Sequence, residues 1–263
     1  MRGRIGALCR GRICALSLCA LALAAALPGG EQSAVYRATG SDARLFDQYD
    51  NDGYSLAVVP SEKGVELRVR VSDAPLESTA PFPTGLRRET SLTTAPDRDA
   101  FAARLARGSR TSAEAVRRVL VEVASEIRYD PDRLRNQDPT AVFASRRAYC
   151  VGYSELAVDL LRRLSIRART VQGVLRSEPG ADRYDPAIEG VYHRWIEVFY
   201  PDRGFVFSDP AGSINGVDAR YLPFDRRSLT RPRSLHLKGV EPPTGTLNYE
   251  AVVAGKTSVR IRR

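Results

Sequence analysis

Lysine is scarce in this chain of 263 residues. Only Lys63, Lys238 and Lys256 are present, so arginine carries nearly all of the positive charge. The sequence also lacks a basic stripe with interleaved aromatic residues, the pattern that indicates a nucleic-acid-binding surface. We therefore expect no nucleic-acid partner. A weak attraction to anionic polymers of a cell envelope stays open.

Long apolar runs are also lacking, since none reaches the ~18 residues that a membrane-spanning helix requires. The apolar run over residues 13–27 follows four arginines and contains Ala24-Ala25-Ala26, small residues of the kind found before a cleavage site. This pattern predicts a secretory signal peptide over residues 1–26. The mature protein would be periplasmic or secreted, with no integral membrane association. An uncleaved membrane anchor is the alternative.

Cysteine becomes scarcer once the signal peptide is removed. Cys9, Cys14 and Cys19 leave with it, so only Cys150 remains. A single thiol in an oxidising compartment has no disulfide partner, and it is a liability unless it is buried or used chemically. The formal net charge falls from +9 to about +5 with the loss of four arginines. The mature chain is therefore only modestly basic.

The first part of the mature chain, residues 27–100, has the pattern of a small β-rich segment. Apolar and charged residues alternate over 65–71, which is the period of a half-buried strand, and 54–59 predicts its hairpin partner. The sequence Asp50-Asn51-Asp52-Gly53 invites comparison with a calcium loop. The first and last ligand positions of such a loop would carry no acidic residue here, so the segment predicts a turn.

Helical sequence follows. Thr111 and Glu114 form a capping box ahead of an apolar stripe with helical spacing that ends near Ile127. Asp138-Pro139 predicts the start of a short helix, and a third helix begins around Cys150. The apolar period then changes from 3.6 to two, which predicts strands over 170–175, 191–200 and 205–209.

Three residues at the ends of these elements have the chemistry of a nucleophilic site. Cys150 stands at the start of a helix, where free N–H groups and the helix dipole favour a thiolate. His193 follows 43 residues later on a strand, and Asp209 another 16 residues later on the next strand. A thiolate needs an imidazole as ion-pair partner and proton donor, and the imidazole needs a carboxylate to fix its tautomer. Each residue alone also has an ordinary structural explanation, which we expect for the second histidine, His236.

The sequence around these residues resembles the core of the transglutaminase-like superfamily over residues 110–212. The run from Tyr149 to Arg169 resembles its cysteine-bearing helix and the turn after it. Residues 192–198 resemble its histidine strand, and 204–210 its aspartate strand. Departures from the family pattern indicate a divergent branch, so substrate specificity is not carried over; they are Arg147-Ala148, Ser165, Arg167 and Arg194.

The resemblance implies an α+β, papain-like fold, in which a Cys-bearing helix packs on an antiparallel sheet within a catalytic domain over 101–263. It implies a cysteine peptidase, amidase or acyltransferase with Cys150 as nucleophile, His193 as base and Asp209 as orienting acid. The substrate would be a protein or peptide amide, and water is our first choice of acyl acceptor. The Cys150 backbone N–H and a guessed second donor, Gln137, would hold the oxyanion. No metal or organic cofactor is implied. A non-catalytic envelope module that retains the fold is the alternative.

The hairpin between the last two strands sets a geometric condition. A symmetric loop of two or four residues centred on Asp202-Arg203 would pair Asp209 with Ile196, on the face opposite His193. An odd loop or a bulge would return Asp209 to the face of His193. The catalytic interpretation therefore predicts an odd connection or a bulge between residues 199 and 207.

Overall fold

The structure is a computed structural model whose described part comprises residues 30–72, 78–83, 96–181, 183–226, 232–247, 249–253 and 256–262. The predicted signal peptide, residues 1–26, lies outside the described residues. No helix within the described part is long and apolar enough to cross a membrane.

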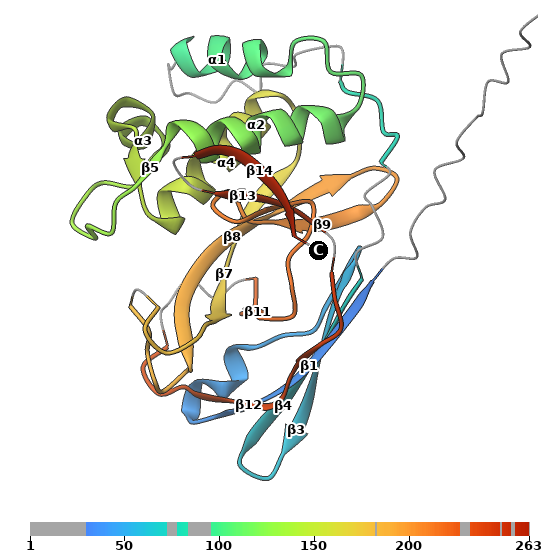
Figure 1. The fold of residues 1–263 in the computed structure, drawn as a ribbon, viewed down its shortest axis with the longest axis vertical. Helices are drawn as coiled ribbons and strands as arrows, with labels where there is room; N and C mark the ends of the chain where they lie inside the picture. Colours follow the sequence, from blue (N-terminus) through green and yellow to red (C-terminus); the bar gives the residue numbers. More distant parts are fainter. Residues whose placement is uncertain are drawn as a thin grey trace, which may run out of the picture.

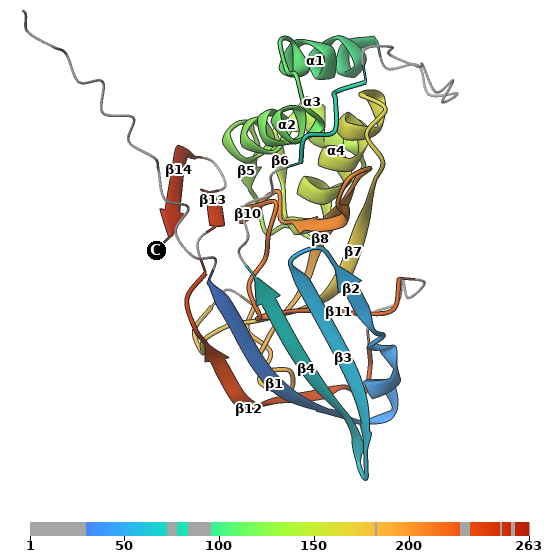
Figure 2. The ribbon, with the colours of Figure 1, turned by 90° about the vertical axis from the view of Figure 1, so that its right-hand side faces the viewer.

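The chain folds into three layers, with helices on one side, a central antiparallel sheet, and a second antiparallel sheet on the other side (Figure 1). This second sheet, which we call the N-terminal sheet, has the strand order β12-β1-β4-β3-β2 and faces the viewer in Figure 2. A short 3-10 helix, Ser41–Leu45, follows β1 in the chain. Its strands are β1 (Glu31–Thr39), β2 (Tyr49–Asn51), β3 (Tyr54–Ser61), β4 (Gly64–Ser72) and β12 (His236–Thr244).

Alternation in the sequence explains the N-terminal sheet. Leu67, Val69 and Val71 are buried, whereas Arg68 and Arg70 between them are exposed. Strands β3 and β4 pair as the predicted hairpin around Glu62-Lys63. The pairing of β1 with β12, from the far end of the chain, was not predicted.

The predicted turn between β2 and β3 is also present, and it contacts the central sheet. Gly53 has φ +75°, a conformation that suits glycine. The Asp52 carboxylate receives two hydrogen bonds from Arg203, at 2.7 and 3.1 Å, and the Asp52 N–H donates to the carbonyl of Phe205. The acidic segment is therefore a turn that is hydrogen-bonded to the hairpin containing Arg203 and Phe205.

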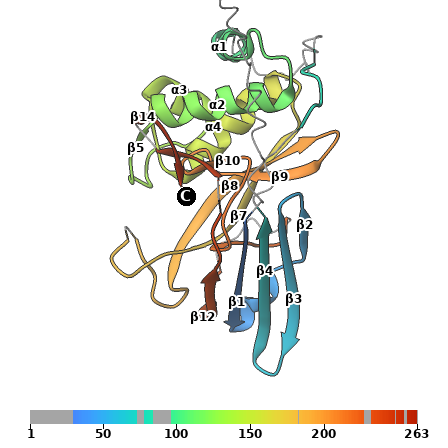
Figure 3. The same ribbon diagram turned by 45° about the vertical axis from the view of Figure 1, so that its right-hand side comes forward.

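In the described part of the chain, four helices lie on the other side of the central sheet (Figure 3), and the last of them packs on it. The three predicted helices are confirmed, whereas the first, over Pro96–Ala106, was not predicted. Thr111 caps the second helix by accepting the Glu114 N–H, and the Glu114 carboxylate accepts the Arg110 N–H. The predicted apolar stripes are buried on both longer helices. The helices are α1 (Pro96–Ala106), α2 (Ser112–Glu126), α3 (Pro139–Ser145) and α4 (Cys150–Arg163).

The central sheet separates two hydrophobic cores. Its order is β11-β7-β8-β9, with every neighbouring pair antiparallel. Along one strand, Ile196 and Val198 pack into the core under the helices, while Trp195 packs into the core shared with the N-terminal sheet. The strands are β7 (Ala168–Arg176), β8 (Gly190–Tyr200), β9 (Gly204–Ser208) and β11 (Tyr221–Pro223).

Two smaller sheets complete the fold. One pairs β5 (Arg128–Tyr129) with β6 (Arg147–Ala148), just before the cysteine helix. The other contains β10 (Ser213–Ile214), β13 (Tyr249–Val253) and β14 (Lys256–Arg262), and its last two strands lie against α2. The architecture is the α+β class that the sequence predicted, with the Cys-bearing helix packed on an antiparallel sheet. The predicted domain boundary at residue 100 stays a prediction.

Candidate active site

Cys150 is the first residue of α4, as predicted, and is partly exposed. The N-cap residue, Tyr149, makes no side-chain hydrogen bond to the first turn of the helix. Free N–H groups at such a terminus carry partial positive charge, which stabilises an anion nearby. The helix thus presents the thiol where a thiolate is favoured.

His193 and Asp209 come together because the β8–β9 turn has an odd number of residues. Tyr200 pairs with Gly204, so the turn contains three residues, and the same register continues to the pair Ile196–Ser208. Asp209 directly follows β9 and therefore lies on the face of His193. The distance from His193 Nε2 to Asp209 Oδ2 is 2.7 Å. The predicted odd connection is confirmed.

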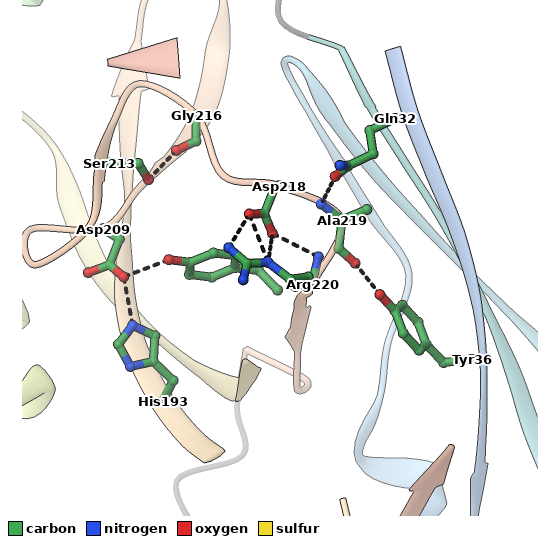
Figure 4. Close-up of polar contacts among 10 residues, drawn as sticks. Gln32, Tyr36, His193, Asp209, Ser213, Gly216, Asp218, Ala219 and Arg220 are labelled. Atoms are coloured by element: carbon green, nitrogen blue, oxygen red, sulfur yellow. Dashed lines mark hydrogen bonds and ion pairs between the residues drawn. The ribbon is translucent and has the colours of Figure 1, made fainter. Parts of the chain in front are cut away.

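The Asp209 carboxylate is held at both oxygens, and Figure 4 shows its contact with His193. Oδ2 contacts His193 and also accepts a hydrogen bond from Tyr221 Oη at 2.8 Å, while Oδ1 accepts the Ala211 N–H at 2.9 Å. The Asp209 backbone is fixed by a bridge to Ser213. Its side chain is only 3 % exposed, so the carboxylate is isolated from water and aimed at the imidazole.

Burial and charge act in opposite directions on these groups. Burial on its own would lower the pKa of His193, but Asp209 and the Cys150 side chain raise it to about 10. Burial would raise the pKa of Cys150, but its hydrogen bond to His193 and the imidazolium charge outweigh this effect and lower that pKa. The pKa of Asp209 is also lowered, because His193 and the hydrogen-bond donors outweigh burial. These opposite shifts favour a thiolate beside an imidazolium over the neutral pair.

The backbone of Arg194 connects the histidine strand to the cysteine helix. Its N–H donates to the Cys150 sulfur, which also lowers the pKa of that thiol. Its carbonyl accepts a 3.0 Å hydrogen bond from Ser154 Oγ, one helical turn after Cys150. Its side chain pairs with Glu155 of α4 at 2.9 Å. Strand and helix are therefore held in a fixed position relative to each other at the site.

Aromatic rings enclose His193. Trp195 stacks nearly parallel to the imidazole at 6.1 Å, and Tyr221 meets it edge-on at 5.9 Å. Gly173, the register partner of His193 on β7, leaves room for this arrangement. A Cβ at that position would lie 2.6 Å from the Trp195 ring and 2.2 Å from the Leu222 carbonyl oxygen. The histidine ring is thus fixed in orientation by Trp195, by Tyr221 and by its hydrogen bond to Asp209.

Gln137 lies beside the start of α4, but its amide is turned. Its Oε1 accepts the Tyr149 N–H at 3.2 Å, and its Nε2 donates to the Arg135 carbonyl. Gly152 permits this approach, since a Cβ there would lie 2.6 Å from Gln137 Oε1. In this arrangement the amide nitrogen serves the loop before α3. The oxyanion role of Gln137 stays a prediction.

The second histidine lies on a strand of the N-terminal sheet. His236 is exposed on β12, opposite Thr39. Within the described ranges, no group of three or more His, Cys, Asp or Glu side chains is arranged to hold a metal ion.

Sequence reasoning missed the Tyr221 phenol and the Arg194 N–H, both of which contact the site. Tyr221 belongs to a three-residue strand with no recognisable period, and a backbone N–H leaves no trace in a sequence. Ser154 was missed as well, although its position four residues after Cys150 places both residues on one face of the helix.

Comparison with known proteins finds a family match. The model of the transglutaminase-like superfamily matches residues 99–210, which include all three predicted catalytic positions. The comparison with curated proteins found no match.

Solved structures that match part of this chain were also found. One is a candidate cysteine protease from Cytophaga hutchinsonii, with 11% identity, TM-score 0.44, and coverage of 88% of this chain and 94% of that one. Another is the periplasmic domain of TgpA from Pseudomonas aeruginosa, with 16% identity, TM-score 0.39, and coverage of 69% and 88%. A third is a TGase with 19% identity, TM-score 0.36, and coverage of 68% and 49%. At these identities and TM-scores, none carries an inference about activity. Residues 99–210 of this chain match the transglutaminase-like superfamily, the family that the sequence resembles.

Proposed function

We propose that this protein is a cysteine enzyme that cleaves or transfers the acyl group of an amide. The observation that supports this proposal most directly is the chain of contacts from Cys150 through His193 to Asp209. It begins at a helix N-terminus and ends at a buried carboxylate 2.7 Å from the imidazole. These are the elements of an activated thiol nucleophile.

In the first half of the proposed reaction, the Cys150 thiolate attacks the carbonyl carbon of the amide, forming a C–S bond and an oxyanion. The Cys150 backbone N–H at the start of α4 is oriented to stabilise that oxyanion. The imidazolium of His193 then donates its proton to the amide nitrogen, the C–N bond breaks, and the amine leaves. An acyl-enzyme remains. Asp209 keeps the imidazole in the tautomer and orientation that this transfer requires.

In the second half, a nucleophile enters the place that the amine has left. His193, now neutral, accepts a proton from it, the nucleophile attacks the thioester carbonyl, and the C–S bond breaks to regenerate the thiolate. Water as the nucleophile makes the protein a peptidase or amidase, and this is our proposal. An amine would make it a cross-linking acyltransferase.

The experiment that tests this function combines trapping with product analysis. A peptide-based, thiol-directed covalent probe should label the wild type at Cys150 and should leave Cys150→Ala unlabelled. Unmodified peptides incubated together with a dansylated amine should then yield hydrolysed products in mass spectrometry. Amine-bearing products would instead indicate acyl transfer. Absence of both products, and of Cys150 labelling, would contradict the proposal and favour a non-catalytic module.

We also propose that the protein acts outside the cytoplasm, on the basis of the basic and apolar sequence over residues 2–27. Mass spectrometry of the protein from its native host should find a mature N-terminus near Leu27. The fractionation control is a variant in which the four N-terminal arginines are replaced by glutamate, which should retain the uncleaved chain inside. A full-length wild-type chain confined to the cytoplasm would rule the proposal out.

A further inference from the structure

Besides His193, a second side chain contacts the Asp209 carboxylate, and it belongs to none of the three predicted catalytic residues. We infer that Tyr221 is a positioning residue of this site, and that the N-terminal sheet holds it in place. The inference rests on the proposed function, since it concerns the same thiolate–imidazolium pair. Tyr221 lies beyond residues 99–210, so the family match itself does not include it.

The first step of the argument is the shared oxygen (Figure 4). Asp209 Oδ2 lies 2.7 Å from His193 Nε2 and 2.8 Å from Tyr221 Oη. With Oδ1 fixed by the Ala211 N–H, the carboxylate cannot rotate without breaking a hydrogen bond. The phenol thus fixes the particular oxygen that orients the imidazole.

The second step is that the phenol always acts as a donor. Burial, reinforced by the Asp209 charge, raises the pKa of Tyr221 well above its ordinary value. The hydroxyl therefore stays protonated throughout the pH range in which a thiolate–imidazolium pair exists. Hydrogen bonds from a neutral donor to a charged acceptor are stronger than those between neutral groups.

The third step concerns what positions Tyr221. Its carbonyl accepts a 2.5 Å hydrogen bond from Tyr54 Oη of β3, 167 residues earlier in the chain. Two residues before it, Ala219 is held at both ends of its backbone by β1. Its N–H donates to Gln32 Oε1 at 2.8 Å, and its carbonyl accepts from Tyr36 Oη at 2.9 Å. Figure 4 shows the β1 side chains reaching across to this segment.

These contacts give the N-terminal sheet a function at the active site. Side chains of β1 and β3 fix the backbone of residues 219–221, this backbone fixes the Tyr221 phenol, and the phenol fixes Asp209. Loss of the phenol would leave Oδ2 with His193 as its one side-chain partner among the contacts described above. The carboxylate would then spend less time in the orientation that stabilises the imidazolium.

The test uses iodoacetamide, which alkylates thiolates, and compares the rate at pH 6 with the rate at pH 10. At pH 6 the rate depends on the ion pair, whereas at pH 10 even an unassisted thiol is largely ionised. The ratio of the two rates therefore reports ion-pair stability, and a change in the accessibility of Cys150 cancels out. A tyrosine with only a structural role would leave the ratio unchanged.

We expect Tyr221→Phe to lower this ratio several-fold, because a weaker ion pair raises the pKa of Cys150 and leaves less thiolate at pH 6. Tyr54→Phe, which leaves the phenol present but frees the backbone that carries it, should lower the ratio by a smaller factor. The matched control is Tyr200→Phe, which removes the hydroxyl of another buried tyrosine, on β8. That hydroxyl donates to Asn215, and its removal should leave the ratio as in the wild type.

Two outcomes would overturn the inference alone: a wild-type ratio in Tyr221→Phe, or an equal fall in Tyr200→Phe. If Tyr221→Phe does not fold, Tyr54→Phe decides, and an unchanged ratio there overturns the inference. Failure of the proposed function has a different signature, because the wild-type ratio would then already equal that of His193→Ala.

Discussion

At pH 6, replacement of His193 by alanine is expected to slow iodoacetamide alkylation of Cys150 by on the order of 100-fold, because an unassisted thiol with a pKa near ~8.5 is less than ~1% ionised there. In the wild type, the imidazolium of His193 opposes the effect of burial and lowers the pKa of Cys150. A low-pKa thiolate is somewhat less nucleophilic, which keeps the expected factor below the full ratio of ionised fractions. Stopped alkylation reactions analysed by mass spectrometry give the rate.

The dependence of the alkylation rate on pH shows in which direction the pKa of Cys150 is shifted. The wild-type rate should fall at a lower pH than the His193→Ala rate, because the imidazolium of His193 lowers the pKa of Cys150. The His193→Ala rate should rise through a single titration near ~8.5. Asp209→Asn should lie between the two, because the imidazole remains but loses its charged partner. The control is His236→Ala, which removes the other histidine from an exposed position on β12. Identical profiles for wild type and His193→Ala would show that Cys150 is not an activated nucleophile.

Replacement of Glu197 by glutamine should lower the free energy of unfolding by ~2–3 kcal/mol, because loss of this buried negative charge would leave its positively charged partners unpaired. Glu197 is 0% exposed on β8. Its carboxylate receives hydrogen bonds from Arg169 Nε at 2.6 Å and Asn51 Nδ2 at 3.1 Å, and lies 3.4 Å from Arg226 Nε. Both arginines retain access to water, which places the expected loss at the lower end for a broken buried ion pair.

Urea unfolding followed by circular dichroism measures this loss as a lower midpoint with an unchanged slope. The control is Glu66→Gln, which removes the partner of Arg68 from an ion pair on the exposed surface of β4. Exposed pairs contribute less than ~1 kcal/mol, so this midpoint should hardly move. Equal losses in the two variants would show that the buried carboxylate of Glu197 stabilises the protein no more than an exposed one does.

Much of the site could be predicted from the sequence because it depends on local patterns. Periodicity located the helix that begins at Cys150 and the strand that carries His193. Counting residues in the turn that begins at Pro201 showed that Asp209 reaches the face of the histidine only with an odd loop or a bulge. Whether a turn contains an odd or an even number of residues depends only on neighbouring positions in the chain. The structure has the odd, three-residue turn that the catalytic interpretation requires.

The remaining contacts could not be predicted because they join residues far apart in the sequence. Tyr221 meets Asp209 only because β11 pairs with β7, and it is positioned by Tyr54 from a separate sheet. No spacing or period encodes a contact across 167 residues. The same holds for β12, whose residues are almost all exposed and therefore show no strand-like alternation.

The position of β1 between β4 and β12 has a consequence for the order in which the chain can fold. Ser33 of β1 lies beside Thr244 of β12, 211 positions later, whereas the β3–β4 hairpin closes locally. Pairings between distant segments form slowly, and until they form the outer edge of β1 keeps unpaired backbone groups. A chain made from its N-terminus would therefore hold this edge open for most of its synthesis. A product interrupted before β12 would contain the whole of residues 99–210 and still present β1 as a strand ready to pair with another molecule.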